Sequence, residues 1–477
     1  MMRNQETLTL LKSFRFLFAT GEHRRSKRRE LYADLMPGGT HKSRLSPNQL
    51  DRAIGSMLGL ACGDALGAGY EFKARVPYTQ PIAMNGGNGW ELGEWTDDTD
   101  MAICIAQVAA SGHDLLTKQA QDNIVQKWID WTDGAKDVGL QTSAVLELVG
   151  TNGDAIGARN AALEVHNDNG RSAGNGSLMR TAPIALAYLH DQESLTIAAR
   201  QISDLTHYES DAGDACVLWC QAIRHTVLHG ELPDFSQLVR FLPPEDQQKW
   251  LHRISEAYKY ESFQFENNGW VVAAFQAALS AIAHAGTPPE IPELGLSRNQ
   301  HLQISLERAV RCGGDTDTVA AIAGSLVGAL WGARAIPESW RSKLHGFPEY
   351  LAEDLVHLAL QIATKGEVNP GGYLNQHNSV EESWSPFNNQ QNQPVHPFFD
   401  PRHSQKLQVA RTVSGDSAAL LATEFGLLQR HGGAWIESRI DVDEIAEIER
   451  ELTISEDLLV DIAELVARFD ELEFSRA

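Results

Sequence analysis

The sequence predicts an all-α protein, a compact multi-helix globule built around one binuclear metal cleft. Apolar residues recur at spacings of three and four from about residue 46 to 365, which is typical of helices with one buried face. Few stretches alternate with period two, so little sheet is expected. No fixed repeat is present, which favours a globule over a helical array. Two acidic clusters, Thr96–Asp100 and Gly313–Thr318, each come directly before a helical stretch.

The helical region begins with a clear start signal. Ser46 is placed to cap the first helix, and Pro47 is tolerated at its first position because that amide has no partner inside the helix. Further helices are expected at 100–111, 115–131, 155–167, 178–190, 194–205, 209–228, 245–259, 268–285, 300–311, 318–334 and 350–364.

The charge pattern divides the chain into four segments. Residues 1–45 form a basic arm in which Leu8, Leu11, Phe14 and Phe18 have amphipathic spacing ahead of a basic run at 23–29. Residues 46–365 form the main domain. Residues 366–403, rich in Pro, Gly, Asn and Gln, are predicted to be a linker. Residues 404–477 are predicted to form a small acidic extension that is mostly helical.

Composition restricts the class of protein. The formal net charge of −23 argues against general nucleic-acid binding and favours cationic partners. Five cysteines within apolar runs indicate free buried thiols in a reducing compartment. Cys216 and Cys220 are one helical turn apart, but no second Cys/His pair completes a metal site. No apolar run is long enough to cross a membrane and no signal peptide is apparent, so a cytoplasmic protein is expected.

The acidic clusters are the chemically informative feature. One or two acids before a helix are ordinary, because they complement the helix dipole and cap free amides. Three acids in four residues at 97–100 exceed that need, and a second acidic start, with Asp315 and Asp317, recurs before a later helix. Oxygen ligands from Asp and Thr, with no His or Cys beside them, suit Mg²⁺, Mn²⁺ or Ca²⁺. If the clusters meet, they can hold two metal ions that activate water.

Three further features are open to a structural and a functional interpretation. Gly59, Gly63 and Gly67 recur every four positions, which favours close helix packing. The loop from Arg171 to Ser177 contains Gly-Asn-Gly, which usually only turns the chain but can expose amides to a phosphate group before a helix. A lone His207 is more often structural than catalytic. Walker, nucleophile-elbow and His-Glu-x-x-His motifs are absent.

Taken together and in their order along the chain, these motifs resemble those of the ADP-ribosylglycohydrolase family. This family includes the dinitrogenase-reductase-activating glycohydrolases. The resemblance covers about residues 48–365 and leaves out both flanking regions. The matching pieces are Gly63-Asp64-Ala65-Leu66-Gly67 with Glu71, Trp95-Thr96-Asp97-Asp98-Thr99, Gly174-Asn175-Gly176 with Met179-Arg180, Thr206-His207, and Gly314-Asp315-Thr316-Asp317-Thr318.

The resemblance implies a role for each matching position. It implies two Mg²⁺ or Mn²⁺ ions, with Glu71 and Asp98 as catalytic carboxylates. The implied metal ligands are Thr96, Asp97, Asp98, Asp315, Asp317 and Thr318. The implied substrate-binding residues are Ser172, Gly174, Asn175, Gly176 and His207.

The implied reaction is attack by water on the anomeric carbon of an ADP-ribosyl group carried by a protein. An arginine linkage is expected, while serine-linked or free ADP-ribose substrates stay open. A second function, of a different class, is an immunity protein that inserts residues 1–45 into an ADP-ribosyltransferase toxin. The alternative interpretation of this arm is a leader segment that binds no partner.

Overall fold

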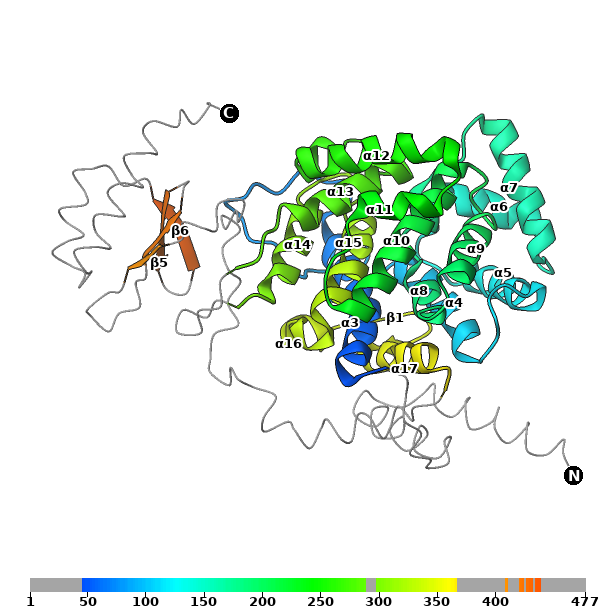
Figure 1. Cartoon of the computed structure of the whole chain (residues 1–477), viewed down its shortest axis with the longest axis horizontal. Coiled ribbons are helices and arrows are strands. Elements are labelled where there is room, and N and C mark those ends of the chain that lie inside the picture. Colours follow the sequence, from blue (N-terminus) through cyan, green and yellow to red (C-terminus); the bar gives the residue numbers. More distant parts are fainter. Residues whose placement is uncertain are drawn as a thin grey trace, which may run out of the picture.

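The computed structural model describes residues 45–288 and 297–366, and the backbone of four strands between residues 408 and 438. Figure 1 shows the helices gathered into one body, with α3 and α15 running through its centre. The predicted arm (apart from Leu45) and the predicted linker (apart from Gly366) lie outside the described residues. The expectations for these two segments therefore stay predictions.

The body is almost entirely helical, as predicted. Its α-helices are α3 (Pro47–Gly67), α4 (Asp97–Ala110), α5 (Lys118–Thr132), α6 (Leu140–Val149), α7 (Ala155–Asn169), α8 (Ala182–Ala187), α9 (Gln192–Ser203), α10 (Ser210–His229), α11 (Phe235–Leu238), α12 (Pro244–Lys259), α13 (Val271–Ala283), α14 (Gln300–Val310), α15 (Thr316–Trp331), α16 (Glu338–Arg341) and α17 (Ala352–Thr364). Short 3₁₀ turns are η1 (Ala68–Tyr70), η2 (Asn175–Ser177), η3 (Val239–Phe241), η4 (Ser262–Gln264) and η6 (Ala333–Ala335). Strands β1 (His345–Gly346) and β2 (Tyr350–Leu351) form one antiparallel pair.

The start of the body follows the predicted chemistry. Ser46 caps α3, and its hydroxyl oxygen accepts a hydrogen bond from the amide of Gln49, whose side chain bonds back to the Ser46 amide. Several segments differ from expectation. The helix predicted at 178–190 is shortened to α8. Helices α6, α11 and α16 were not predicted, because α6 has too few buried positions to give a strong period and the other two have only four residues each.

Two glycine-rich helices form the centre of the body. Every residue of α15 from Thr316 to Ala329 is buried. A Cβ atom on Gly59 would lie 2.2 Å from the carbonyl oxygen of Gly324, and one on Gly63 would lie 1.9 Å from that of Ala320. The two backbones therefore touch, which confirms the packing interpretation of the α3 glycines. Gly55 meets Gly328 at the other end of this contact, so the helices are antiparallel.

The region after the linker is partly described. Strands β3 (Gln408–Ala410), β4 (Leu420–Thr423), β5 (Gly426–His431) and β6 (Ala434–Ser438) pair in that order as an antiparallel sheet. These strands were not predicted, and the mostly helical character expected of residues 404–477 as a whole stays a prediction. Short hairpin strands have too few residues to stand out against the helical period of the acidic stretch at 440–474, which lies outside the described residues.

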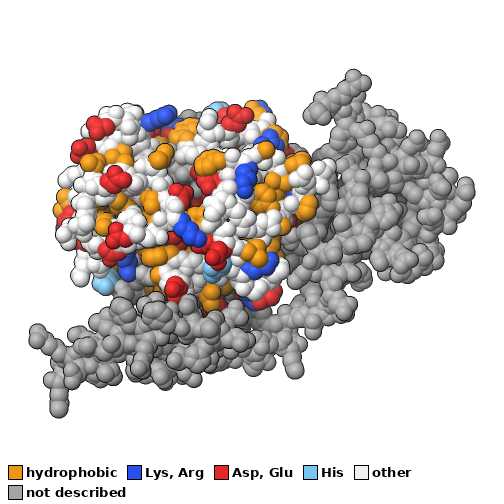
Figure 2. All heavy atoms as spheres, turned by 180° about the vertical axis from the view of Figure 1, so that it is seen from behind, with side chains coloured by type: hydrophobic (Ala, Val, Ile, Leu, Met, Phe, Trp, Pro, Cys, Tyr) orange, Lys and Arg blue, Asp and Glu red, His pale blue; other side chains and the backbone are white. Residues whose placement is uncertain are grey.

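The surface and cysteines agree with the composition. On the face in Figure 2, acidic, basic and apolar side chains are interspersed, with no broad basic field. No helix among the described residues is long and apolar enough to span a membrane. All five cysteines are free and buried, as predicted.

Candidate metal centre

The antiparallel contact of α3 and α15 brings the two acidic turns together. The end of α3 lies against the start of α15, where the hydroxyl of Thr316 donates to the carbonyl oxygen of Gly67 at 2.9 Å. The amide of Phe72 donates to the carbonyl oxygen of Gly314 at 2.8 Å. Glu71 is thereby held beside the second acidic turn, although 244 positions separate Glu71 from Asp315 (315 − 71).

The first acidic turn is held by a buried carboxylate of α3. Asp64 is fully buried, and one of its oxygens accepts a hydrogen bond from the amide of Thr96 at 2.9 Å. Its other oxygen accepts from the amide of Thr99 at 3.0 Å and from the Thr99 hydroxyl at 2.5 Å. Asp64 therefore caps the start of α4, and the acids of the turn are free for another role.

The acids of this turn divide into one structural residue and two candidates for chemistry. Asp100 accepts hydrogen bonds from the indoles of Trp95 at 3.0 Å and Trp131 at 2.9 Å, so both its oxygens are occupied. Asp97 is only partly buried and accepts the amide of Gly139 at 3.3 Å. Asp98 points into the interior and is fully buried.

The two turns meet at Asp98. One of its oxygens accepts the hydroxyl of Thr96 at 3.0 Å and that of Thr318 at 3.4 Å, so both turns contact the same carboxylate. Beside it, Glu71, Asp315 and Asp317 each offer an oxygen, and these atoms lie within 4.8 Å of one another. The structure thus brings all six predicted ligands and Glu71 into one region.

Two buried oxygens in this cluster have no hydrogen-bond donor. Oδ1 of Asp98 and Oδ1 of Asp317 accept no hydrogen bond from any described residue. An unpartnered buried carboxylate oxygen is costly. A cation between the turns would satisfy both atoms with the ligand type that Mg²⁺ and Mn²⁺ prefer, so the residues fit a metal ion.

The electrostatics favour the same interpretation. Burial, reinforced by the neighbouring carboxylates, raises the pKa of Asp98 and of Asp317 well above the ordinary range. Burial and the charges of Asp315, Asp137 and Asp64 raise the pKa of Glu71 to about 7. The pKa of Asp97 is raised to about 8, mainly by burial and then by the charge of Asp137. Crowded carboxylates therefore repel one another until protons or a cation neutralise them.

The glycine loop differs from the expected open cradle. The amides of Ser172, Gly174 and Asn175 already donate within the protein, to Glu209, to Gln141 and to the carbonyl oxygen of Gly269. Backbone at Gly174 and Gly176 is partly exposed, whereas the side chains of Ser172 and Asn175 are buried beneath it. The buried side chains therefore support the loop, while the two glycines form its accessible surface.

His207 supports the same loop from below. It is buried, and its Nε2 atom would lie 3.2 Å from a Cβ atom on Gly174 and 3.4 Å from one on Gly176. Its Nδ1 atom lies 2.7 Å from the hydroxyl of Thr206, which accepts a hydrogen bond from Arg180 at 2.7 Å. Burial and the charge of Arg180 hold the pKa of His207 well below its ordinary value, so the ring is neutral and its Nε2 faces the glycines.

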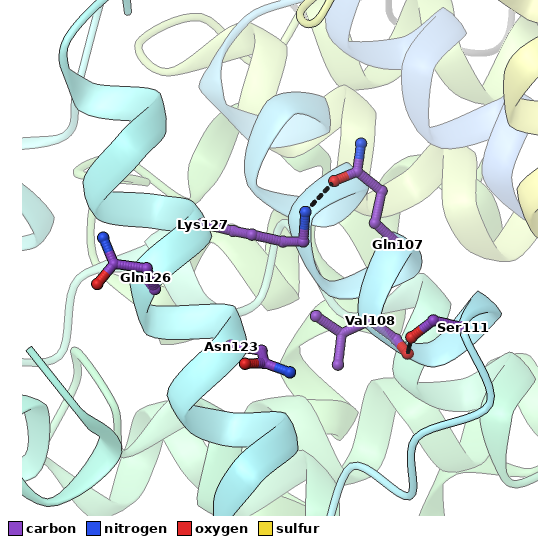
Figure 3. A pocket seen from close by; sticks show the side chains of 6 residues that line it. All are labelled: Gln107, Val108, Ser111, Asn123, Gln126 and Lys127. Carbon is purple, nitrogen blue, oxygen red and sulfur yellow. Dashed lines mark hydrogen bonds between the residues drawn. The ribbon is translucent and has the colours of Figure 1, made fainter. Parts of the chain in front are cut away.

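A hollow elsewhere on the body carries no chemistry. It has a volume of about 320 Å³ and lies between α4 and α5, away from the acidic start of α4. Figure 3 shows its lining residues, Gln107, Val108, Ser111, Asn123, Gln126 and Lys127. Lys127 donates to Gln107 at 2.8 Å, so its charged group is engaged within the wall.

Sequence reasoning missed the roles of three residues that build the centre. Asp64 belongs to a matching motif but was given no role, because it lies inside a helix, where an acid usually faces solvent. Gln141 donates to the carbonyl oxygens of Ser172 at 2.8 Å and Thr206 at 3.0 Å, and thus joins the glycine loop to the His207 segment. Asn268 contacts the second acidic turn. Each acts across long sequence separations, and no local pattern marks such contacts.

The body is helical, and its two acid-bearing turns meet. These features place the protein in a class of helical proteins with a carboxylate cluster able to hold a metal ion. The family model described as ADP-ribosylglycohydrolase matches residues 45–370. The chain therefore belongs to the ADP-ribosylglycohydrolase family, a family of hydrolases, as the motifs predicted.

Individual relatives agree with this assignment. The chain is 32% identical over 332 residues to ADP-ribosylarginine hydrolase Tri1 of Pseudomonas putida (strain GB-1), covering 67% of this chain and 81% of the relative. It is 26% identical to ADP-ribosyl-[dinitrogen reductase] glycohydrolase of Rhodospirillum rubrum, covering 62% and 92%. It is 30% identical to human ADP-ribosylhydrolase ARH3, covering 63% and 91%. A solved chain of an ADP-ribosylglycohydrolase-related protein complex superposes with a TM-score of 0.52 at 28% identity, covering 68% of this chain and all of that chain.

Proposed function

We propose that this protein is a metal-dependent hydrolase that removes ADP-ribose from ADP-ribosylated proteins, most readily from arginine. The observation that carries the proposal is the pair of buried, donor-free oxygens on Asp98 and Asp317, where the two acidic turns meet. The names of the relatives support the substrate class, since each describes removal of an ADP-ribosyl group.

We assign two Mg²⁺ or Mn²⁺ ions to this centre. Residues from the first turn would hold one side and residues from the second turn the other, namely Thr96, Asp97 and Asp98, and Asp315, Asp317 and Thr318. When bound, the metals supply positive charge that orients the ribose hydroxyls and lowers the pKa of water. The hydrogen bonds from Thr96 and Thr318 to Asp98 orient that carboxylate before a ligand arrives.

Glu71 and Asp98 are the candidate catalytic carboxylates. A pKa of about 7 lets Glu71 take a proton from the attacking water at neutral pH and return it later. Water forms a bond to the anomeric carbon as the carbon–nitrogen bond to the leaving group breaks. The leaving guanidine gains one proton, so ADP-ribose and an unmodified arginine are the products.

The charge around the cluster supports a cationic leaving group. Asp137 is exposed, and its charge contributes to the raised pKa values of both Glu71 and Asp97, so it lies near both. Asp137 lies outside the assigned metal ligands and catalytic carboxylates, so its charge favours a guanidinium over a neutral serine hydroxyl. We therefore expect arginine-linked substrates to be preferred.

The glycine loop is assigned to the diphosphate. Gly174 and Gly176 offer accessible backbone, and the neutral His207 presents its Nε2 atom directly beneath. In the tautomer in which the Thr206 hydroxyl donates to Nδ1, Nε2 carries the proton, and this donor together with close approach to backbone suits phosphate oxygens. Ser172 and Asn175 contribute by holding this loop in place.

The test is release of ADP-ribose from an arginine-ADP-ribosylated protein, measured with Mg²⁺ and with EDTA. Wild type should release ADP-ribose only with metal, and Asp97→Ala should abolish release. Asp133→Ala, which changes an exposed acid after α5, is the matched control and should be fully active. Release that is insensitive to EDTA would refute metal dependence, and faster release from a serine-linked substrate would refute the arginine preference.

A second activity is proposed from the sequence of residues 1–45 alone, namely neutralisation of an ADP-ribosyltransferase toxin by insertion of this arm. The two activities are separable. Asp97→Ala should abolish ADP-ribose release without impairing inhibition of a transferase, whereas deletion of residues 1–45 should have the opposite effects. A deletion variant that inhibits as well as the full chain would exclude the arm.

A further inference from the structure

The turn before α13 contains a buried amide that contacts the second acidic turn. Asn268 is only 4% exposed, and it lies outside every motif that predicted the site. None of the hydrogen bonds of its side chain runs to α13. Its contacts instead run to residues 312–315, which are more than 40 positions away in the chain.

The two ends of the Asn268 amide fix the backbone around Asp315. Its Oδ1 atom accepts a hydrogen bond from the amide of Asp315 at 3.0 Å, and its Nδ2 atom donates to the carbonyl oxygen of Gly313 at 2.8 Å. Gly314 between them has φ +68°, and a Cβ atom there would lie 2.4 Å from Asn268 Oδ1. The side chain therefore fills the space that a glycine leaves and holds the turn on both sides.

The main chain of the same segment reaches the glycine loop. The carbonyl oxygen of Asn268 accepts a hydrogen bond from Asn175 Nδ2 at 2.9 Å, and the same Nδ2 donates to a carboxylate oxygen of Asp315 at 2.7 Å. The amide of Asn175 donates to the carbonyl oxygen of Gly269 at 3.0 Å. Residues 268–269 thus join the glycine loop to the turn that carries Asp315.

We propose that Asn268 is a positioning residue for the metal centre, whose side chain fixes the backbone of the turn that carries the Asp315 carboxylate. An amide suits this role because it accepts at one end and donates at the other without adding charge beside the carboxylates. Partners that orient metal ligands commonly change metal affinity by 10- to 100-fold when removed. The inference rests on the proposed function for its metal, but not for its reaction.

The test compares Asn268→Ala with Ser262→Ala in the full chain. Ser262 is equally buried in the same connecting segment, and its hydroxyl donates to the carbonyl oxygen of Arg308 at 3.1 Å, away from the acidic turns. The first measurement is the Mn²⁺ dissociation constant by calorimetry, with the melting temperature recorded in EDTA. We expect about tenfold weaker Mn²⁺ binding for Asn268→Ala and wild-type affinity for Ser262→Ala.

Asn268→Gln is the conservative variant. It keeps both the accepting and the donating end of the amide and adds no charge, so its Mn²⁺ affinity should fall less than that of the alanine variant. If Asn268→Ala does not fold, this variant decides the question. Wild-type Mn²⁺ affinity in the folded Asn268 variants, or an equal loss in Ser262→Ala, would overturn the assignment.

The result is distinguishable from failure of the proposed function. A wild-type protein that binds Mn²⁺ but releases no ADP-ribose would contradict the hydrolase and leave the role of Asn268 intact. A wild-type protein that binds no Mn²⁺ would overturn both.

Discussion

The contact between α3 and α15 makes a sharp prediction for Gly63→Ala. The added Cβ atom would lie 1.9 Å from the carbonyl oxygen of Ala320 and 2.4 Å from its carbonyl carbon. Ordinary contact requires about 3.4 Å, so the helices must separate by about 1.5 Å (3.4 − 1.9). Backbone cannot rotate away as a side chain can, and overpacking in a core costs about 1–3 kcal/mol or more. We expect a loss of about 3 kcal/mol in the free energy of unfolding.

The assay is urea unfolding of the metal-free protein, beside Gly157→Ala as a matched control. Gly157 is also helical, but a Cβ atom there meets only Asp154 Oδ1, at 3.4 Å. The control should be neutral or up to about 1 kcal/mol more stable, since alanine is the better helix former. A Gly63→Ala protein as stable as the control would refute the inference that the two backbones touch. ADP-ribose release should also fall, because the same contact sets the two acidic turns against each other.

Three other predictions follow from the buried acids. Burial raises the pKa of Glu307 from 4.5 to about 7, so the stability it contributes is complete below pH 4.5 and is lost as pH rises through 7. Glu307→Gln should flatten the pH dependence of the melting temperature between about pH 5 and 8, and an unchanged slope would contradict this. Mg²⁺ at 100 times its dissociation constant should stabilise wild type by about 2.7 kcal/mol, whereas Asp317→Asn should show a much smaller shift in melting temperature. Asp64→Ala leaves three donors of the 96–99 turn without an acceptor, and should cost about 2–4 kcal/mol in urea unfolding; a loss below 1 kcal/mol would refute its capping role.

Local patterns predicted most of the helices and marked the two acidic turns as candidates for one metal centre. The capping signal at Ser46 and the apolar spacing of α10 and α15 are short-range features, so they can be recognised in the sequence. The acidic turns could be paired because the first contains more carboxylates than a helix start requires and the second repeats its pattern of Asp and Thr. Their close approach could not be derived from spacing alone, because it depends on the antiparallel contact of α3 with α15.

What the sequence could not predict depends on tertiary contacts. Asp64 binds a turn 32 to 35 residues away, and Asn268 binds one 47 residues away. The glycine loop looked open because nothing local indicated that Gln141 and Gly269 would occupy its amides. Single polar residues of this kind have ordinary neighbours in the sequence, and only the fold reveals their partners.

The pairing of α3 with α15 also determines when the core can form during synthesis. Thr316 contacts Gly67 across 249 residues, so the glycine face of α3 leaves the ribosome long before its partner exists. At about 5–20 residues per second, this delay is roughly 12–50 s. During that interval, the nascent chain exposes a helix that has no other surface to bury its glycines against. We therefore expect the core to form only after α15, which ends at Trp331, has left the ribosome.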